Sequence, residues 1–376
     1  MALHPRMILF LLLGLSVTSE AATSLCVLDM TRCVCKVMAI HNPQGLDCFE
    51  ALELELRDGK LDDSSEVDTG KYSNVLSLLW IDKLIFNNVT ISSSFISAVT
   101  PFLPFLRLSK INIISSTLKG VQPLKYPELP KASNIETLLL EDVRMDSVLL
   151  QPSFKQWLFG SLRSLVLVRC GLVEIDCSWA QTLENLAQLD LSENPISFTS
   201  MQNISHCPSL LFNLKSLHLR RSNLTSLQSL CTLLSLTPAL TVLDVSRNNF
   251  SIVHYPHCLQ LKPLRMLNLY NSLEVFNNPP LTLKKLNLSH NRLIRYPSLG
   301  HLSHLQDLKV DSNQFTILLN ETGVVLNSTP VPPVGFTQNC VKATGRTQPN
   351  DSPLCLTFFV GFLSYLVYFG CENPFC

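Results

Sequence analysis

Apolar residues recur along most of the chain in one pattern, Leu-x-x-Leu-x-Leu-x-x-Asn-x-Leu. The clearest copy spans residues 283–293, and further copies begin at Leu186, Leu240 and Leu305. Two related copies carry Cys170 and Ser222 where the Asn would stand. The alternation inside each copy predicts a short strand with its leucines pointing into a core, and an Asn at the turn can satisfy unpaired backbone groups there.

The spacing of these copies is more informative than any single match. The second apolar anchor of each copy recurs every 19 to 30 residues, at Leu54, Leu84, Ile111, Leu138, Leu165, Leu189, Leu217, Leu243, Leu267, Leu286 and Leu308. Leucine-rich repeats have a period of about 20–29 residues. The sequence therefore predicts an α/β solenoid, a leucine-rich-repeat horseshoe of about eleven repeats over residues 51–330, with a parallel sheet lining its concave face. Residues between the strand leucines should face outward there, namely Asp190, His218, Asp244, Asn268, Asn287 and Lys309.

The N-terminus has the layout of a signal peptide over residues 1–21. His4 and Arg6 precede an apolar stretch at 7–17, and small residues flank a cleavage site after Ala21. A signal anchor is the alternative, although it would need a longer apolar run. Residues 22–50 then form a cysteine-rich cap that would cover the open end of the solenoid.

The C-terminus carries a second apolar run within residues 354–376. The segment 331–353 before it holds the small triplet at 343–345 and a polar spacer, an order typical of a glycosylphosphatidylinositol signal with Ala343 as the attachment site. A short transmembrane helix is the alternative. We expect a lipid-anchored protein on the extracellular face of the plasma membrane that can also be shed or secreted.

Composition supports an exported binding protein. Basic and acidic residues balance at 29 each, which argues against a nucleic-acid partner. Thirteen cysteines in an exported chain indicate disulfides, although a zinc knuckle in the cap is the competing interpretation. Eight glycosylation sequons suggest a glycosylated surface, at Asn88, Asn203, Asn223, Asn249, Asn287, Asn320, Asn327 and Asn350.

The cysteine layout and several repeats resemble one family, the monocyte differentiation antigens, which are lipopolysaccharide co-receptors with leucine-rich repeats. The resemblance rests on the cap at 26–48, the segment 51–55, and the repeats at 189–195 and 286–293. It implies the disulfides Cys26–Cys35, Cys33–Cys48, Cys177–Cys207 and Cys231–Cys258. A further bridge of the family is not matched, because His290 stands where its first cysteine would be and Cys340 is left without that partner. Cys170 is better interpreted as the buried Asn equivalent of its repeat. The acidic cluster of the family's cap is reduced here to Asp29.

The same resemblance implies an apolar lipid pocket between the cap and the first repeats. The matching stretch is rich in apolar residues: Leu76, Leu79, Trp80, Phe95, Ile96, Val99, Phe102, Leu103, Phe105 and Leu106. These residues could instead simply pack the N-terminal end of the solenoid. Nearby cations could meet the phosphates of a glycolipid or remain solvated surface charges, namely Lys60, Lys71, Lys83, Arg107 and Lys110.

Enzymatic chemistry finds no support in the sequence, which has no phosphate loop, nucleophile elbow or zincin motif. The His-x-x-His spacings at 254–257 and 301–304 fall in variable repeat segments, and no cofactor or functional metal is expected. The resemblance implies a homodimeric co-receptor that takes lipopolysaccharide and other microbial lipids from a lipopolysaccharide-binding transfer protein and passes them to a Toll-like receptor complex. The alternative is an adhesion or matrix protein that binds a protein ligand on its concave face, for example through His218 and Asn268.

Overall fold

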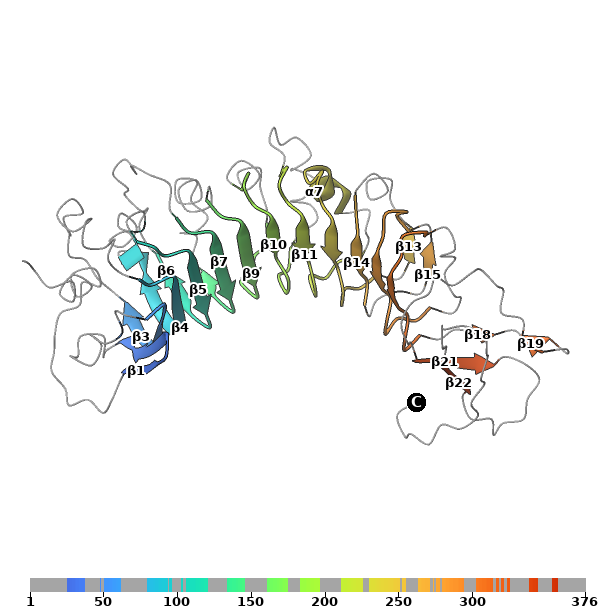
Figure 1. Cartoon of the computed structure of the whole chain (residues 1–376), viewed down its shortest axis with the longest axis horizontal. Helices are drawn as coiled ribbons and strands as arrows, with labels where there is room; N and C mark the ends of the chain where they lie inside the picture. Colours follow the sequence, from blue (N-terminus) through green and yellow to red (C-terminus); the bar gives the residue numbers. More distant parts are fainter. Residues whose placement is uncertain are drawn as a thin grey trace, which may run out of the picture. The chain divides into compact units, whose positions relative to one another are not determined.

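The computed structural model covers the whole chain and folds as two compact units, Met1–Asp190 and Leu191–Cys376. It describes residues 26–37, 48, 51–61, 80–93, 95–96, 103, 106–120, 134–145, 161–174, 183–196, 211–225, 230–250, 252–254, 263–270, 273, 275–277, 279–293, 302–313, 316–317, 319–320, 323–324, 338–343 and 354–357. Within each unit, strands from successive repeats lie side by side in chain order (Figure 1).

Unit 1 is built on a sheet with the order β1-β2-β3-β4-β5-β7-β9-β10. Its cap strands β1 and β2 are antiparallel, and every later neighbour in this order is parallel. Two short strands, β6 and β8, continue a parallel row from the end of β4. The strands are β1 (Cys26–Asp29), β2 (Arg32–Lys36), β3 (Glu53–Leu61), β4 (Lys83–Ser92), β5 (Lys110–Ile114), β6 (Thr117–Lys119), β7 (Thr137–Glu141), β8 (Arg144–Met145), β9 (Ser164–Val168) and β10 (Gln188–Asp190).

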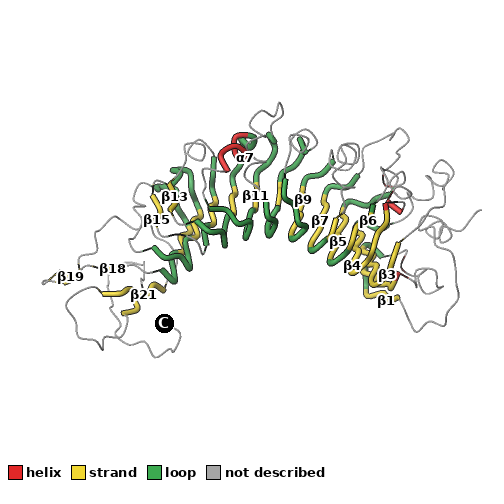
Figure 2. The backbone as a smooth tube through the Cα atoms, turned by 180° about the vertical axis from the view of Figure 1, so that it is seen from behind, coloured by secondary structure: helices red, strands yellow, loops and turns green. Residues whose placement is uncertain are grey.

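Unit 2 has a parallel sheet of three-residue strands in the order β11-β12-β14-β16-β17. The helix α7 (Cys231–Ser235) lies on the side of the unit away from these strands (Figure 2). The sheet strands are β11 (Ser216–His218), β12 (Val242–Asp244), β14 (Met266–Asn268), β16 (Lys285–Asn287) and β17 (Asp307–Lys309). Smaller pairings involve β13 (Ile252–His254), β15 (Val275–Asn277), β18 (Thr316–Ile317), β19 (Leu319–Asn320), β20 (Gly323–Val324), β21 (Gln338–Ala343) and β22 (Leu354–Thr357).

The repeat prediction is confirmed in register. All eleven predicted anchors lie in strands, and inside each unit they are direct partners, as in Leu54 with Leu84 and Leu217 with Leu243. Most of these anchors are buried, and the next residue but one is buried with them because alternate side chains of a strand share a face. The core of each unit therefore lies on one face of its sheet. We call the opposite face the open face.

The predicted role of the turn Asn is also confirmed. Asn248 donates from Nδ2 to the carbonyls of Leu219 and Val245, each at 2.7 Å, and its Oδ1 accepts from the backbone N–H of Ser222 at 2.9 Å. One buried amide thus serves the backbone of its own repeat and of the repeat before it. Asn313 repeats this arrangement three repeats later.

Cys170 occupies the corresponding position, as predicted. Its thiol is buried and donates to the carbonyls of Leu140, one repeat earlier, and Val168, at 3.5 and 3.4 Å. Burial raises the pKa of this thiol to about 11, although a backbone hydrogen bond with Val143 acts in the opposite sense. The side chain therefore stays protonated and can act as the donor that the turn requires.

The turns share a backbone conformation that the sequence pattern does not predict. The residue just before the turn position has a positive φ in ten repeats, although none of the ten is a glycine: Asp58, Asn88, Ser115, Asp142, Arg169, Glu193, Arg221, Arg247, His290 and Ser312. A left-handed conformation costs an L-residue roughly 1–2 kcal/mol.

Two predictions about the ends of the chain lie outside the described residues, namely the signal peptide at 1–21 and most of the apolar tail at 354–376. Within the described part of the chain, none of the helices has the length and apolar character needed to cross a bilayer. The backbone places Cys340 of β21 opposite Cys355 of β22 in antiparallel register.

Candidate functional site

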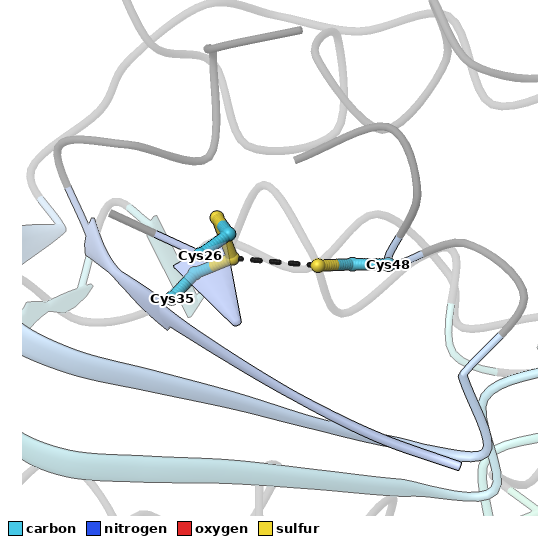
Figure 3. A group of neighbouring side chains, drawn as sticks. All are labelled: Cys26, Cys35 and Cys48. Carbon is cyan, nitrogen blue, oxygen red and sulfur yellow. Dashed lines mark hydrogen bonds between the residues drawn. A yellow bond between two sulfur atoms is a disulfide. The ribbon is translucent and has the colours of Figure 1, made fainter. Parts of the chain in front are cut away.

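The cap at the beginning of unit 1 is closed by two disulfides. Cys26 is bonded to Cys35 and Cys33 to Cys48, which confirms the pairing that the resemblance implies. The two bridges touch, since Sγ of Cys35 lies 3.5 Å from Sγ of Cys48 (Figure 3). The cysteines that lie close enough together for a metal are therefore oxidised and have no thiolate to offer a zinc ion.

Of the four cysteines in the other two predicted disulfides, the described residues include only Cys231. Cys231, at the start of α7, is disulfide-bonded, as predicted. Its expected partner Cys258 lies outside the described residues, as do Cys177 and Cys207.

The open face next to the cap carries a buried carboxylate that the sequence analysis missed. Glu55 of β3 is 1% exposed and accepts hydrogen bonds from Arg32, Arg57 and Asn87. Burial by itself would raise the pKa of Glu55, but the hydrogen bonds from Arg57, Arg32 and Asn87 together lower it to about 2. The alternation Glu53-Leu54-Glu55-Leu56-Arg57 was an available signal, because it places both acids and the arginine on one face of a strand.

The residues predicted to wall the lipid pocket divide into four groups. Phe95 and Leu103 are buried in unit 1, whereas Ile96 and Leu106 are half-buried. Trp80 is exposed. Leu76, Leu79, Val99, Phe102 and Phe105 lie outside the described residues. The structure thus brings part of the predicted set into the N-terminal core, and the pocket itself stays a prediction.

The predicted cations have distinct surroundings. Nζ of Lys83 lies 3.3 Å from Glu53, and Nζ of Lys110 lies 3.2 Å from Asp82. Hydrogen bonds from Ser109 and Lys110 lower the pKa of Asp82 against the opposing effect of burial. Lys83 and Lys110 would therefore have to leave or share a carboxylate in order to bind a phosphate. Lys60 is exposed, and Lys71 lies outside the described residues.

Arg107 and Trp80 form a pair at the edge of the first repeats. The guanidinium carbon of Arg107 lies 4.4 Å from the centre of the Trp80 ring, which is cation–π geometry. Both side chains are exposed. Trp80 was predicted as part of the apolar pocket and Arg107 as one of the nearby cations, and the structure places the two side chains in contact.

The open face carries different residues in the two units. In unit 1 it is mixed: it has a strip of aliphatic side chains, with Leu139 beside Val166 in register and Ile114 on the neighbouring strand, and it also carries the polar residues Asn112 and Glu55 in the same register row. In unit 2 the equivalent residues are polar: His218, Asp244, Asn268, Asn287 and Lys309.

One prediction for this face is wrong in part. Asp190 and Asp244 are buried, although they were expected to face outward with the others. Asp244 lies against His218 and accepts a hydrogen bond from the N–H of Ser246 at 3.0 Å. Its pKa is lowered by the contacts with His218 and Ser246, which outweigh the effect of burial. A short acid can fold back onto its own turn, so an outward position does not guarantee exposure.

A polar cleft of about 450 Å³ lies in unit 2 rather than at the predicted pocket. It is lined by turn residues of three successive repeats, including Glu193, Arg221 and Arg247. Two predicted glycosylation sites, Asn223 and Asn249, also line it. Glycans at either position would occupy or cover the cleft.

Comparison with known proteins agrees with the repeat architecture. A family model described as leucine-rich repeat matches residues 160–212. The chain is 27% identical over 328 residues to monocyte differentiation antigen CD14 of Oryctolagus cuniculus, covering 82% of this chain and 87% of that protein. It is 25% identical to CD14 of Homo sapiens, again over 82% and 87%.

Other relatives share the repeats over a smaller part of their own length. Toll-like receptor 2 of Bos taurus is 27% identical, and the match covers 73% of this chain and 34% of the receptor. Among solved structures, an internalin (inlF) of Listeria monocytogenes is 18% identical with a TM-score of 0.44, covering 76% of this chain and 82% of that one.

Proposed function

This chain is a leucine-rich-repeat protein similar to CD14 along most of its length, and from that premise we propose that it is a cell-surface receptor of innate immunity that binds bacterial lipopolysaccharide. The lipid enters an apolar pocket at the N-terminal end of unit 1. The receptor takes it from a lipopolysaccharide-binding transfer protein and passes it to a Toll-like receptor complex. It is a homodimer held on the membrane by a lipid anchor at Ala343.

The observation that carries this proposal is the similarity to CD14 over 82% of the chain, which extends to the confirmed cysteine pairing of the cap. The local composition agrees with it. Phe95 and Leu103 are buried in unit 1, and the sequence around them is rich in further apolar residues, including Leu76, Leu79, Phe102 and Phe105. Each acyl methylene buried there contributes about 0.8 kcal/mol, so one chain supplies most of a micromolar affinity.

The test is a titration of the purified protein with fluorescent lipopolysaccharide. Leu79→Asp and Phe102→Asp each place a charge in the predicted pocket and should weaken binding by roughly a hundredfold. The matched control is Leu281→Asp, because Leu281 is an exposed leucine of unit 2 and its replacement should leave binding unchanged. Circular dichroism checks that each variant is folded. Undiminished binding by both pocket variants contradicts the proposal.

A second function is favoured by the aliphatic strip on the open face of unit 1. Ile114, Leu139 and Val166 are only half-buried there, as a surface that binds a protein ligand would require. An adhesion or matrix protein would lose its ligand on Leu139→Asp and keep it on Phe102→Asp. A lipid receptor would show the opposite pattern, so the same pair of variants separates the two functions.

A further inference from the structure

The open face of unit 2 carries one asparagine that begins a glycosylation sequon. Among the described residues, four asparagines stand on the open faces of the two main sheets, namely Asn87, Asn112, Asn268 and Asn287. Only Asn287 begins a sequon, because Leu288 and Ser289 follow it. The other sequons with described side chains lie next to a turn position, at Asn88, Asn223 and Asn249. A glycan at Asn287 would therefore differ from those in standing on the open face of a sheet.

Alternation along β16 directs the side chain of Asn287 outward. Its neighbours Leu286 and Leu288 are buried in the core, so the residue between them belongs to the opposite face. Asn287 is half-buried there, in register with Asn268 of β14 on one side and Lys309 of β17 on the other. Neighbouring strands of a sheet lie about 4.8 Å apart, so a group attached to Asn287 stands directly beside these two residues.

The two ends of the Asn287 amide have different surroundings. Oδ1 accepts a hydrogen bond from the backbone N–H of Ser289 at 3.0 Å, which holds the amide against its own turn. Asp244 and Asn268, at the same position of two earlier repeats, also accept from the N–H two residues further on. Nδ2 of Asn287 has no hydrogen-bond partner among the described residues. The oxygen thus serves the turn, and the nitrogen to which a sugar is attached stays available.

We propose that Asn287 carries an N-linked glycan, and that this glycan shields the open face of unit 2 from protein partners. In the transfer, the bond from the first sugar's anomeric carbon to a lipid diphosphate breaks, and a bond from that carbon to Nδ2 forms. Nδ2 gives up one proton, and the lipid diphosphate leaves. Oδ1 stays a carbonyl oxygen, so the hydrogen bond from Ser289 survives and the fold accommodates the modification.

The shielded area is the part of unit 2 on which a protein ligand of the concave face would sit. A specific protein interface buries about 800 Å² on each partner, so it has to extend over several neighbouring strands. A glycan is bulky, and this one rises between β14 and β17, beside Asn268 and Lys309. A partner that contacts these two residues would have to displace it. In unit 1 neither of the open-face asparagines, Asn87 and Asn112, begins a sequon, so this shield belongs to unit 2.

The first measurement is the occupancy of Asn287 in protein secreted by cultured mammalian cells. Trypsin releases this residue within the peptide 286–292, which contains no other sequon. Removal of the glycan by peptide-N-glycosidase in heavy-oxygen water converts a glycosylated Asn to an isotope-labelled Asp. We expect mass spectrometry to find that label at position 287. Recovery of the peptide only in its unlabelled form overturns the proposal.

The second measurement is access to the open face. Lys309 is exposed beside Asn287, so its reaction with an amine-reactive polyethylene glycol reports on shielding. Asn287→Asp removes the sequon and keeps an oxygen for the N–H of Ser289, as Asp244 does in its own repeat. This variant should raise the labelling of Lys309 about threefold or more, relative to the exposed Lys60 of unit 1.

The matched control is Asn249→Asp, which removes a sequon at an exposed residue beside a turn. It should leave the labelling of Lys309 at the wild-type level. If Asn287 is occupied and Asn287→Asp still leaves Lys309 labelled as in the wild type, the glycan does not shield the face and the proposal falls.

The inference goes beyond the lipid-receptor function, because it requires only that the chain is exported. Asn287→Asp leaves the predicted pocket residues of unit 1 intact, so it should bind lipopolysaccharide as the wild type does. A wild-type protein that binds no lipopolysaccharide but shows the label at 287 and a protected Lys309 would overturn the proposed function and leave the shield standing.

Discussion

The repeats of unit 1 and unit 2 close their turns in two different ways. In unit 2 the turn position holds Asn194, Asn248, Asn291 and Asn313, with Ser222 between the first two. The side chain of Asn194 bonds the backbone of its own repeat, and those of the other four residues also bond the backbone of an adjacent repeat. In unit 1 the same position holds Gly59, Val89, Ser116, Val143 and Cys170. The side chains of Val89 and Val143 are buried and contain no polar atoms that could form such hydrogen bonds.

Ser116 and Cys170 still use their side chains at these turns, but where the turn residue is apolar unit 1 relies on backbone pairing instead. Its strands are longer, up to ten residues in β4, and the row β4-β6-β8 continues beyond the turn. The N–H of Asp142 donates to the carbonyl of Val168 at 2.9 Å, and the N–H of Arg144 to that of Ser116 at 3.0 Å. The comparison teaches that a turn needs its backbone groups satisfied, and that either a buried amide or a continued strand can do this.

The largest loss of stability is expected from removing the side-chain amide of Asn248 in unit 2. Asn248→Ala removes a hydrogen-bond partner from three carbonyls, those of Leu219, Val245 and Ser246, and from two backbone N–H groups, those of Ser222 and Leu224. We expect a loss of about 3 kcal/mol in the free energy of unfolding, measured by urea denaturation. Arg221→Ala, at an exposed residue of the neighbouring turn, is the control and should cost less than about 0.5 kcal/mol. Equal effects of the two changes would show that the amide ladder does not hold unit 2.

The reciprocal substitution should be the next largest. Val143→Asn puts a unit 2 residue into a unit 1 turn whose backbone groups are already paired through Asp142 and Arg144. The new amide would be buried without sufficient partners, so we expect a loss of about 2 kcal/mol in the same urea experiment. Val143→Ala should cost a similar amount for a different reason, the lost methyl groups. If Val143→Asn proved stabilising, backbone pairing in unit 1 would be incomplete.

Sequence reasoning reaches the parts of this fold that depend on period and alternation. The eleven strand anchors and the Asn-like role of Cys170 follow from spacing alone, whereas the cap disulfides came from a family resemblance. The positive φ of Arg247 was out of reach, because the N–H of Arg247 is paired with the carbonyl of Tyr270 in the next repeat, a contact that the sequence pattern does not show. The burial of Glu55 depends on Arg32 and Asn87, which come from other strands and cover it. The exposure of Met30 likewise reflects its place next to β1, the outermost strand of the sheet among the described residues.

The buried carboxylate of unit 1 should make that unit sensitive to acid. The folded-state pKa of Glu55 is about 2 against an ordinary 4.5, so protons bind the unfolded chain more readily. The stabilisation is therefore complete above about pH 5 and is lost as the pH falls toward 2. Because Arg32 and Arg57 are half-exposed and screened, we expect about 1 to 2 kcal/mol over this window. Urea titrations between pH 2 and pH 6 should show this slope in the wild type and lose it in Glu55→Gln, whereas Glu136→Gln, at an exposed acid of unit 1, should keep it.

The smallest change in stability is expected at Cys170, the last turn residue of unit 1, which uses a side-chain donor as the turns of unit 2 do. A hydroxyl at this position can donate to the carbonyls of Leu140 and Val168, as Ser222 already does toward Leu191 and Arg220 in unit 2. Cys170→Ser should therefore change the free energy of unfolding by less than about 1 kcal/mol, whereas Cys170→Ala removes the donor and should cost more. The thiol itself, buried and with a pKa near 11, should resist iodoacetamide at pH 8 until the protein unfolds. Rapid labelling of the native protein, compared with the Cys170→Ser variant as a blank, would mean that this turn opens to solvent and that the thiol is not its stable donor.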